Sequence, residues 1–187
     1  MRSGQYNRTM PRDRSGLANF LSRTPFFGGL DDIALRHVVA MTNERTFERG
    51  ASVFREGDQG RAMYVVESGE LMAMKNGDSG RAVRLMHLKP GDFFGETTLI
   101  EMQPRPFSVV VEHEARLLEL TNADLYKLYQ EDVKSYVLVL QNINRELCRR
   151  LRRASVRITA YADEAGDEVT QIRETQPELP RVKRRPS

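Results

Sequence analysis

The sequence predicts an α+β fold in which short β-strands form a sandwich or a jelly-roll barrel, preceded by small helices and followed by a long helix. Apolar residues alternate in short runs between about Thr46 and Thr121, and they recur every three or four residues before and after that region. A chain of 187 residues with 40% hydrophobic and 29% charged residues can bury one core but hardly two. We therefore expect one globular domain over residues 16–160, with a disordered arm at 1–15 and a disordered tail at 161–187.

The segment before the strands carries two short apolar stretches with helical spacing. They are separated at Thr24-Pro25, where the proline favours a turn. Asp31 and Asp32 precede the second stretch, and aspartate is favoured there because its carboxylate accepts hydrogen bonds from free N–H groups at a helix start. The pattern predicts a short helix, a turn and a second helix.

The central region consists of short apolar runs separated by turn-forming residues. The runs are SVF, MYVV, ELMAM, VRLMHL, FSVVV and RLLEL. The residues between them, which we expect to reverse the chain, are Glu56-Gly57-Asp58, Ser68-Gly69, Asn76-Gly77 and Pro90-Gly91-Asp92. Many short strands at such spacing are typical of a sandwich or a jelly-roll barrel. Residues 95–102, GETTLIEM, interrupt the strands with a composition that favours one or two helical turns.

Helical spacing returns after Thr121. Thr121 or Asn122 can cap a helix that begins at Ala123, and a longer helix is expected from about Lys134 to Ile158. The apolar stripe of the longer helix consists of Leu140, Ile143, Leu147, Leu151, Ala154 and Ile158, and its other face is rich in arginine. Because the stripe from Leu140 to Leu151 can form a parallel seam with a second copy, we predict a homodimer through this helix.

The distribution of charges and reactive side chains argues against several function classes. Residues 1–15 carry a net charge of +3, residues 16–160 carry +1 and residues 161–187 carry −1, so the folded part does not favour nucleic acid as a partner. Cys148 is the only cysteine, the three histidines lack metal-ligand spacing, and no catalytic motif stands out. We therefore expect neither an enzyme nor a metal site. Without a membrane-length apolar stretch or a secretion signal, we expect a cytoplasmic protein with no membrane partner.

Two segments of the strand region carry a recognisable pattern. The first, GASVFREGDQGRAMYVVESGEL, contains Gly50, Glu56-Gly57-Asp58, Gly60, Tyr64 and Ser68-Gly69. The second, GDFFGETTLIEMQPRPFSVVV, contains a Gly-Glu pair and an arginine nine residues after the glutamate. Together they resemble the cyclic-nucleotide-binding domains of catabolite activator proteins, protein kinase regulatory subunits and cyclic-nucleotide-gated channels, over approximately residues 19–157. The resemblance implies an eight-stranded β jelly-roll barrel that binds a cyclic nucleotide and acts in regulation.

The second segment is similar to the phosphate-binding cassette of that family. The resemblance assigns ligand binding to Gly95, Glu96, Thr97, Thr98, Arg105, Pro106, Phe107 and Ser108. It also implies that a side chain of the long helix covers the purine, for which Arg149, Arg150 and Arg153 are the candidates. Arg105 suits a cyclic phosphate because a guanidinium is a fixed cation with several donors. Glu96 suits a ribose 2′-hydroxyl because a carboxylate is a strong acceptor.

Simpler roles stay open for each of these residues. Arg105 could be a surface arginine, and Glu96 could be a carboxylate favoured by the dipole at a helix start. Thr98 and Ser108 could serve local backbone groups. Arg150 could belong to a solvated helix face.

Pro106 departs from the pattern of the family. The residue after the cassette arginine usually donates its backbone N–H to the phosphate, and proline has no N–H. This predicts weaker binding. Because proline also lacks a hydroxyl for a guanine amino group, the resemblance favours cAMP, with cGMP as the alternative, and no other cofactor is expected.

Three functions are compatible with the resemblance. The first is a sensor module without its own effector domain, in which a nucleotide at Glu96 and Arg105 alters a surface for an unidentified downstream protein. The second is a transcription regulator, which would require roughly 60 to 70 further residues with a helix-turn-helix after the long helix. The third is a ligand-free scaffold for dimerisation or docking, which Pro106 favours.

Overall fold

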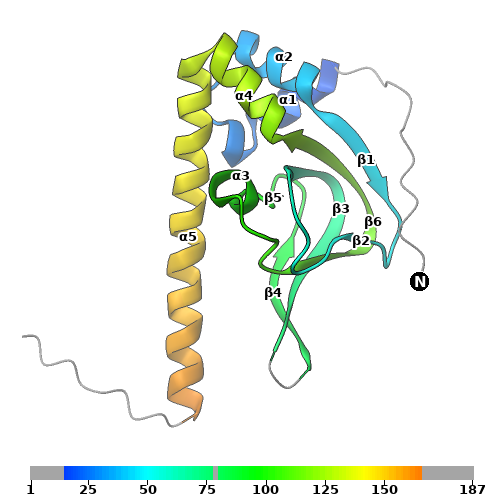
Figure 1. Ribbon diagram of the computed structural model, residues 1–187, viewed down its shortest axis with the longest axis vertical. Helices are drawn as coiled ribbons and strands as arrows, with labels where there is room; N and C mark the ends of the chain where they lie inside the picture. The colour runs from blue at the N-terminus through cyan, green and yellow to red at the C-terminus, as the bar shows by residue number, and fades with distance from the viewer. Residues whose placement is uncertain (1–14, 78–79, 166–187) are drawn as a thin grey trace, which may run out of the picture. The chain divides into compact units, whose positions relative to one another are not determined.

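The computed structural model describes residues 15–77 and 80–165, and it consists of two compact units, residues 1–148 and 149–187. Figure 1 shows the helices and strands. The helices are α1 (Ser15–Ser22), the 3-10 turn η1 (Pro25–Phe27), α2 (Asp32–Met41), α3 (Thr97–Glu101), α4 (Asn122–Glu131) and α5 (Val133–Ala165). The strands are β1 (Asn43–Phe47), β2 (Ser52–Phe54), β3 (Ala62–Asn76), β4 (Ala82–Leu88), β5 (Phe93–Phe94) and β6 (Ser108–Thr121). All of these strands lie in the first unit.

The strands form one antiparallel sheet with the order β1-β6-β3-β4. Strand β2 also pairs with β6, and β5 also pairs with β3. Within the described residues the sheet has six strands and is not closed, because no pairing joins β4 to β1 or β2. The α+β class is therefore confirmed, whereas the prediction of an eight-stranded closed barrel is wrong in strand number and in closure.

The lower strand number results from two long strands that each contain two of the predicted runs. MYVV and ELMAM both lie in β3, so Ser68-Gly69 does not reverse the chain. Instead, the pairing with β6 shifts register between Val66 and Leu71, and Gly69 has a φ of 89°. A Cβ on Gly69 would lie 2.3 Å from the carbonyl oxygen of Glu114 on β6. Gly69 is thus a bulge that bends one continuous strand and lets the neighbouring strand approach closely.

The predicted helix starts are confirmed at α2 and α4. The Asp31 carboxylate accepts hydrogen bonds from the N–H groups of Ile33 at 3.0 Å and Ala34 at 2.9 Å. Thr121 caps α4 in a capping box with Asp124. Helix α5 continues to Ala165, so the first five residues of the segment expected as a tail are helical. The remainder of that tail and residues 1–14 of the predicted arm lie outside the described residues.

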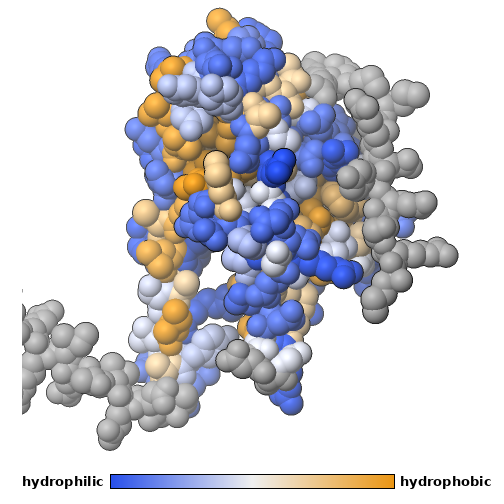
Figure 2. All heavy atoms as spheres, in the orientation of Figure 1, coloured by the Kyte–Doolittle hydropathy of each residue, from blue (hydrophilic) through white to orange (hydrophobic). Residues whose placement is uncertain are grey.

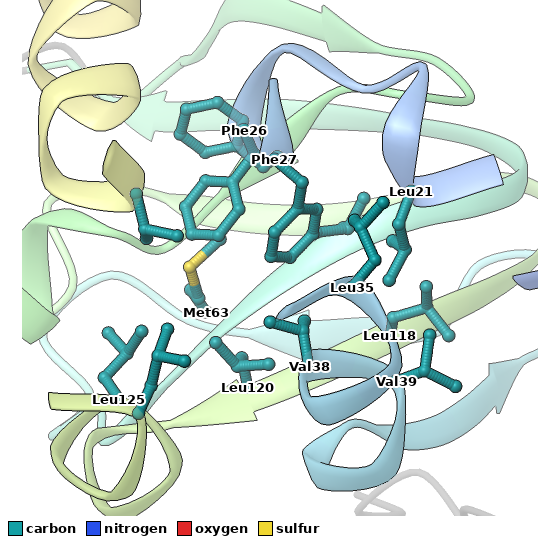
Figure 3. Close-up of a cluster of buried hydrophobic side chains, with 14 of the residues drawn as sticks. Leu21, Phe26, Phe27, Leu35, Val38, Val39, Met63, Leu118, Leu120 and Leu125 are labelled. Atoms are coloured by element: carbon teal, nitrogen blue, oxygen red, sulfur yellow. The ribbon is translucent and has the colours of Figure 1, made fainter. Parts of the chain in front are cut away.

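One hydrophobic cluster packs the helices of the first unit against the sheet (Figure 3). Phe26 and Phe27 of η1 are fully buried, and the ring centroid of Phe26 lies 4.9 Å from that of Phe93 on β5. Ile143 of α5 is also fully buried in this cluster. The buried Asn142 side chain donates to the Phe26 carbonyl oxygen at 3.1 Å, which fixes this part of α5 to η1. The first half of α5 is therefore part of the core.

This packing changes the interpretation of the predicted dimer seam. Ile143 faces its own core, and Leu140 and Leu147 pack partly against the same cluster. The seam predicted from Leu140 to Leu151 is wrong for Ile143, because a residue that is 0% exposed cannot contact a second copy. Leu151 is 69% exposed.

Among the described residues, no helix is both long and apolar enough to cross a membrane.

Candidate functional site

Arg105 is buried in the loop between α3 and β6. Only 4% of the residue is exposed. Its backbone is paired with the turn after β2, since its N–H donates to the carbonyl oxygen of Asp58 at 2.8 Å and its carbonyl oxygen accepts from Gly57 N–H at 2.9 Å. Its guanidinium donates through Nη1 to Gly95 O at 3.0 Å and to Thr98 Oγ1 at 2.8 Å, and through Nη2 to Ala62 O at 2.6 Å. Arg105 is not a surface arginine.

Two glycines and an aromatic ring form a slot around the guanidinium, which we call the Arg105 slot (Gly60, Gly95 and Phe54). A Cβ on Gly60 would lie 2.4 Å from Arg105 Nε, and a Cβ on Gly95 would lie 2.5 Å from Nη1. The Arg105 Cζ lies 4.0 Å from the centroid of the Phe54 ring, within the range of a cation–π contact. Gly95 also needs glycine because its φ is 81°. The slot therefore admits the guanidinium only because both positions lack a side chain.

The Arg105 guanidinium is a buried cation with carboxylates nearby and with one N–H group that stays unsatisfied within the described residues. Burial lowers the pKa of Arg105, while the nearby Tyr64, Glu96 and Asp58 raise it. The Nε–H group of Arg105 is buried and has no hydrogen-bond acceptor among residues 15–77 and 80–165. Buried polar groups are normally paired, and an unpaired donor on a buried cation marks a place where an anion can bind favourably.

Glu96 precedes the first turn of α3 and is 2% exposed. Its side chain makes no capping hydrogen bond to α3 within the described part of the chain, and its position at the helix start leaves open the simpler role of a carboxylate favoured by the helix dipole. Its charge raises the pKa of Arg105, which shows that the two groups interact. The structure thus brings together an acceptor and a donor of opposite charge that are nine residues apart in the sequence.

The neighbouring predicted residues have mainly structural contacts. Thr98 Oγ1 donates to Gly95 O at 2.8 Å and accepts from Arg105, and Ser108 Oγ accepts from Glu56 N–H at 2.9 Å. Phe107 packs against a second hydrophobic cluster, which contains Phe54, Tyr64 and Phe94, with its ring centroid 6.2 Å from that of Phe54. Thr97 is half-buried and Pro106 is exposed. The simpler roles of Thr98 and Ser108 agree with these contacts.

A polar network that sequence analysis missed lies beside the Arg105 slot. Tyr64 donates to Glu119 Oε1 at 3.2 Å, and Arg45 donates to Glu119 Oε2 through Nε at 3.0 Å and Nη2 at 2.8 Å. Burial and the Glu119 carboxylate raise the pKa of Tyr64 to about 12, so its hydroxyl keeps its proton at neutral pH. The Tyr64 ring stacks on that of Phe94, with their centroids 5.5 Å apart. This network holds Tyr64, whose ring centroid lies 6.3 Å from that of Phe54, the ring under Arg105.

The strand region and its site match a known family. The cyclic nucleotide-binding domain model matches residues 44–132, which include the Arg105 slot, Glu96 and the Tyr64 network. These residues belong to the cyclic nucleotide-binding domain family.

Two curated relatives and one solved structure illustrate the similarity. The cyclic AMP receptor protein of Thermus thermophilus is 30% identical over 135 residues, which cover 72% of this chain and 61% of the relative. A cAMP-dependent protein kinase regulatory subunit of Aspergillus niger is 32% identical over 101 residues, covering 54% of this chain and 24% of the relative. The N-terminal domain of a transcriptional regulator from Streptomyces coelicolor A3(2) has a TM-score of 0.64 at 30% identity, covering 73% of this chain and 94% of that one. The chain therefore spans less than two thirds of either curated relative.

The cyclic nucleotide-binding domain also has an apolar groove on the side of α3 that carries Leu99 and Ile100. Its volume is about 570 Å³, and Figure 2 shows hydrophobic side chains at the surface in this part of the first unit. The groove is lined by Leu99, Ile100, Met102, Asn122, Leu125, Tyr126, Tyr129, Tyr136, Leu140 and Ile143. None of these side chains is charged, so the groove does not suit a phosphate. The candidate site of the domain is the Arg105 slot.

Arg150 lies in the second unit, on the part of α5 beyond Cys148. It is half-buried there. Its predicted position over the purine of a bound nucleotide stays a prediction.

Proposed function

We propose that this cyclic nucleotide-binding domain is a cAMP sensor in which Arg105 binds the cyclic phosphate and Glu96 binds the ribose 2′-hydroxyl. The observation that carries the proposal is the buried Arg105 cation, held in a slot of two glycines, whose Nε–H group has no acceptor in the part of the chain that the structure describes. A cyclic phosphodiester carries one negative charge, and its removal from water is costly unless charged donors replace the lost hydration. Arg105 supplies that compensation.

The proposed role of Glu96 follows from its charge. A carboxylate repels a phosphate but accepts strongly from a hydroxyl, so Glu96 suits the sugar and leaves the phosphate to Arg105. A ribose hydroxyl that donates to a buried carboxylate would distinguish cAMP from its 2′-deoxy analogue, because the deoxy compound would leave the acceptor without a donor.

The choice of cAMP is supported by Pro106 and by the relatives. Proline offers no hydroxyl for the amino group of guanine, and both curated relatives named above carry cAMP in their names. We further propose that the bound nucleotide changes the surface offered to a downstream protein, in the absence of any catalytic step by this domain.

Calorimetric titration tests the proposal. Cyclic AMP is expected to bind more tightly than cGMP or 2′-deoxy-cAMP, and linear AMP should bind weakest because its phosphate carries a second charge and lacks the ring geometry. Failure of all four compounds to bind would contradict the sensor function and would favour the ligand-free scaffold.

We also propose that the chain forms a homodimer through the solvent-facing row of α5. Val137, Asn144, Leu151 and Ile158 follow one another at intervals of seven residues, and all four are exposed. Such a row can supply the a positions of a parallel two-stranded coiled coil, and a single asparagine at an a position favours two strands in register. This row replaces the seam that included Ile143.

Leu151→Glu tests the dimer because it places like charges opposite each other in the seam. The variant is expected to sediment as a monomer at concentrations where the wild type is a dimer. Val156→Glu is the matched control, since Val156 is 71% exposed on the same helix but lies outside the row. A monomeric wild type, or equal dissociation by both variants, would refute this interface.

A further inference from the structure

Lys75 contacts the backbone directly after Arg105. It lies near the end of β3, where it pairs with Val83 of β4. Its Nζ donates to the carbonyl oxygen of Pro106 at 3.0 Å. Because Pro106 has no N–H, this carbonyl oxygen is the group through which its backbone can be held by a hydrogen bond. Lys75 thus holds the one position at which the cassette lacks its usual donor.

Glu56 in turn holds Lys75. One carboxylate oxygen, Oε1, accepts from Lys75 Nζ at 2.6 Å, and the other, Oε2, accepts from Asn76 N–H at 3.2 Å. The hydrogen bond from Lys75, followed by that from Asn76, lowers the pKa of the Glu56 carboxyl. The backbone N–H of Glu56 donates to Ser108 Oγ at 2.9 Å. Lys75, Glu56 and Ser108 therefore enclose Pro106 and Phe107 in a ring of contacts.

The same turn holds Arg105 itself. Gly57 and Asp58, the two residues after Glu56, make the backbone hydrogen bonds to Arg105 at 2.9 and 2.8 Å. Residues 56–58 thus hold the cassette at Arg105 through the backbone, and beyond Arg105 through Lys75 and Ser108. A loss of the Lys75 contact would free the carbonyl oxygen of Pro106 and leave the backbone hydrogen bonds of Arg105 in place.

The exposure of the Lys75–Glu56 ion pair indicates whether its loss should change folding stability or ligand affinity. The side chains of Lys75 and Glu56 are 50% and 28% exposed. Exposed ion pairs contribute little to folding stability because water and salt screen them. An effect of Lys75 is therefore expected on the geometry of the loop and on ligand affinity, with little effect on unfolding.

We propose that Lys75 is a positioning residue for the cyclic nucleotide. It holds Pro106 through its carbonyl oxygen, and so keeps the loop after Arg105 in the geometry that receives the phosphate, in place of the direct N–H donor that proline cannot supply. The inference rests on the proposed binding of cAMP at Arg105. It adds a residue from the β3–β4 hairpin to a site whose other members are Phe54, Gly60 and residues between Gly95 and Ser108.

Titration of the full chain with cAMP tests this role. Lys75→Met keeps the length of the side chain and removes the charge, and it is expected to weaken cAMP binding about five- to tenfold, which is less than the full loss of a hydrogen bond to a charged group because Lys75 acts through the loop and not on the ligand. Its melting temperature should match that of the wild type. Lys127→Met is the matched control, because Lys127 is also an exposed lysine paired with a glutamate, Glu131. The control should bind as the wild type does.

Two further variants distinguish the hydrogen bond of Lys75 to Pro106 from a general effect of its positive charge on cAMP binding. Lys75→Arg should restore binding to within about twofold, because a guanidinium can donate to both Glu56 and Pro106 O. The exchange Lys75→Glu with Glu56→Lys keeps an ion pair but removes the donor on β3, so it should bind as weakly as Lys75→Met. Wild-type affinity for cAMP in Lys75→Met, or in the exchange variant, would overturn the positioning role of Lys75 and leave the proposed binding at Arg105 intact. A wild-type chain that does not bind cAMP would overturn both proposals.

Discussion

The two hydrophobic clusters of the first unit differ in what they surround. The cluster between the helices and the sheet, around Phe26 and Phe27, consists of apolar side chains. The second cluster, around Phe54, Tyr64 and Phe94, borders the buried Arg105. Burial of a charge is costly unless it is compensated, so a domain selected only for stability would not need one there. The first cluster packs only apolar side chains, whereas the second also borders a buried cation, as the proposed binding of a phosphate would require.

Phe26→Ala is expected to have the largest effect, and that effect should fall on stability. Phe26 is 0% exposed and contacts Phe27 and Phe93 at ring centroid distances of 4.5 and 4.9 Å. Removal of a buried phenyl ring costs about 3–5 kcal/mol of unfolding free energy. Urea denaturation measures this loss. Tyr126→Ala is the control, because Tyr126 is 60% exposed and its removal should change stability by less than about 1 kcal/mol. Equal losses in both variants would contradict the assignment of Phe26 to the core.

Arg105→Ala should have the opposite profile, with a large effect on binding and a small one on folding. The substitution leaves a bound phosphate without its cation, and truncation of a buried charged partner costs about 2–4 kcal/mol, or roughly 30- to 1000-fold in affinity for cAMP. Stability should fall less than in Phe26→Ala, because the variant also removes the cost of burying a charge. Calorimetry with cAMP and urea denaturation measure the two quantities. Unchanged affinity would remove Arg105 from the site.

Gly60→Ala tests the shape of the Arg105 slot without removing the cation. The added methyl group would lie 2.4–2.8 Å from the guanidinium, so Arg105 must move. Overpacking of this kind costs about 1–3 kcal/mol, and we expect a similar loss in cAMP affinity. In an Arg105→Ala background the same substitution should no longer destabilise the domain, because its steric partner is gone.

Gly16→Ala provides the comparison for Gly60→Ala. Gly16 is exposed on α1, and a Cβ there would meet no atom of the described residues within 4 Å. This variant should bind cAMP as the wild type does. If Gly60→Ala also binds normally, the slot is looser than its distances indicate.

Local patterns predicted the elements whose causes are local. The caps at Asp31 and Thr121 depend on residues within three positions, and the helix at 97–101 depends on a short segment. The prediction of a turn at Ser68-Gly69 is wrong. A dipeptide with one glycine is compatible with a turn and with a bulge, and the segments before and after it show the same alternation of apolar and polar side chains in either case. Only the pairing of β3 with β6 distinguishes them.

The site was predictable where its residues adjoin one another and not where strand pairing assembles it. Glu96 and Arg105 lie in one segment, and the structure brings them together. Tyr64 and Glu119 are 55 residues apart and meet only because β3 pairs with β6. Gly60 has no positive φ, so its need for glycine comes entirely from the Arg105 side chain. Likewise, the stripe on α5 could not show that Ile143 is covered by its own chain.

Pro106→Ala is expected to have the smallest effect, and it is the one substitution that should improve binding. Alanine restores a backbone N–H directly after Arg105 and keeps the carbonyl oxygen that accepts from Lys75. A hydrogen bond to a charged group contributes about 1.5–3 kcal/mol, and part of this is lost to the greater freedom of the loop, so cAMP should bind about tenfold more tightly. The loss of proline raises the entropy of the unfolded chain and should lower stability by about 0.4–1 kcal/mol.

The matched control for Pro106→Ala is Pro104→Ala. Pro104 is exposed in the same loop, and its replacement frees the backbone to a similar degree without adding a donor after Arg105. Tighter binding in Pro106→Ala and not in Pro104→Ala would show that the backbone at 106 faces the phosphate. If both variants bind equally or more weakly than the wild type, the N–H at position 106 points away from the ligand. Binding at the slot would then rest on the Arg105 guanidinium, with Lys75 acting on a loop that does not itself touch the phosphate.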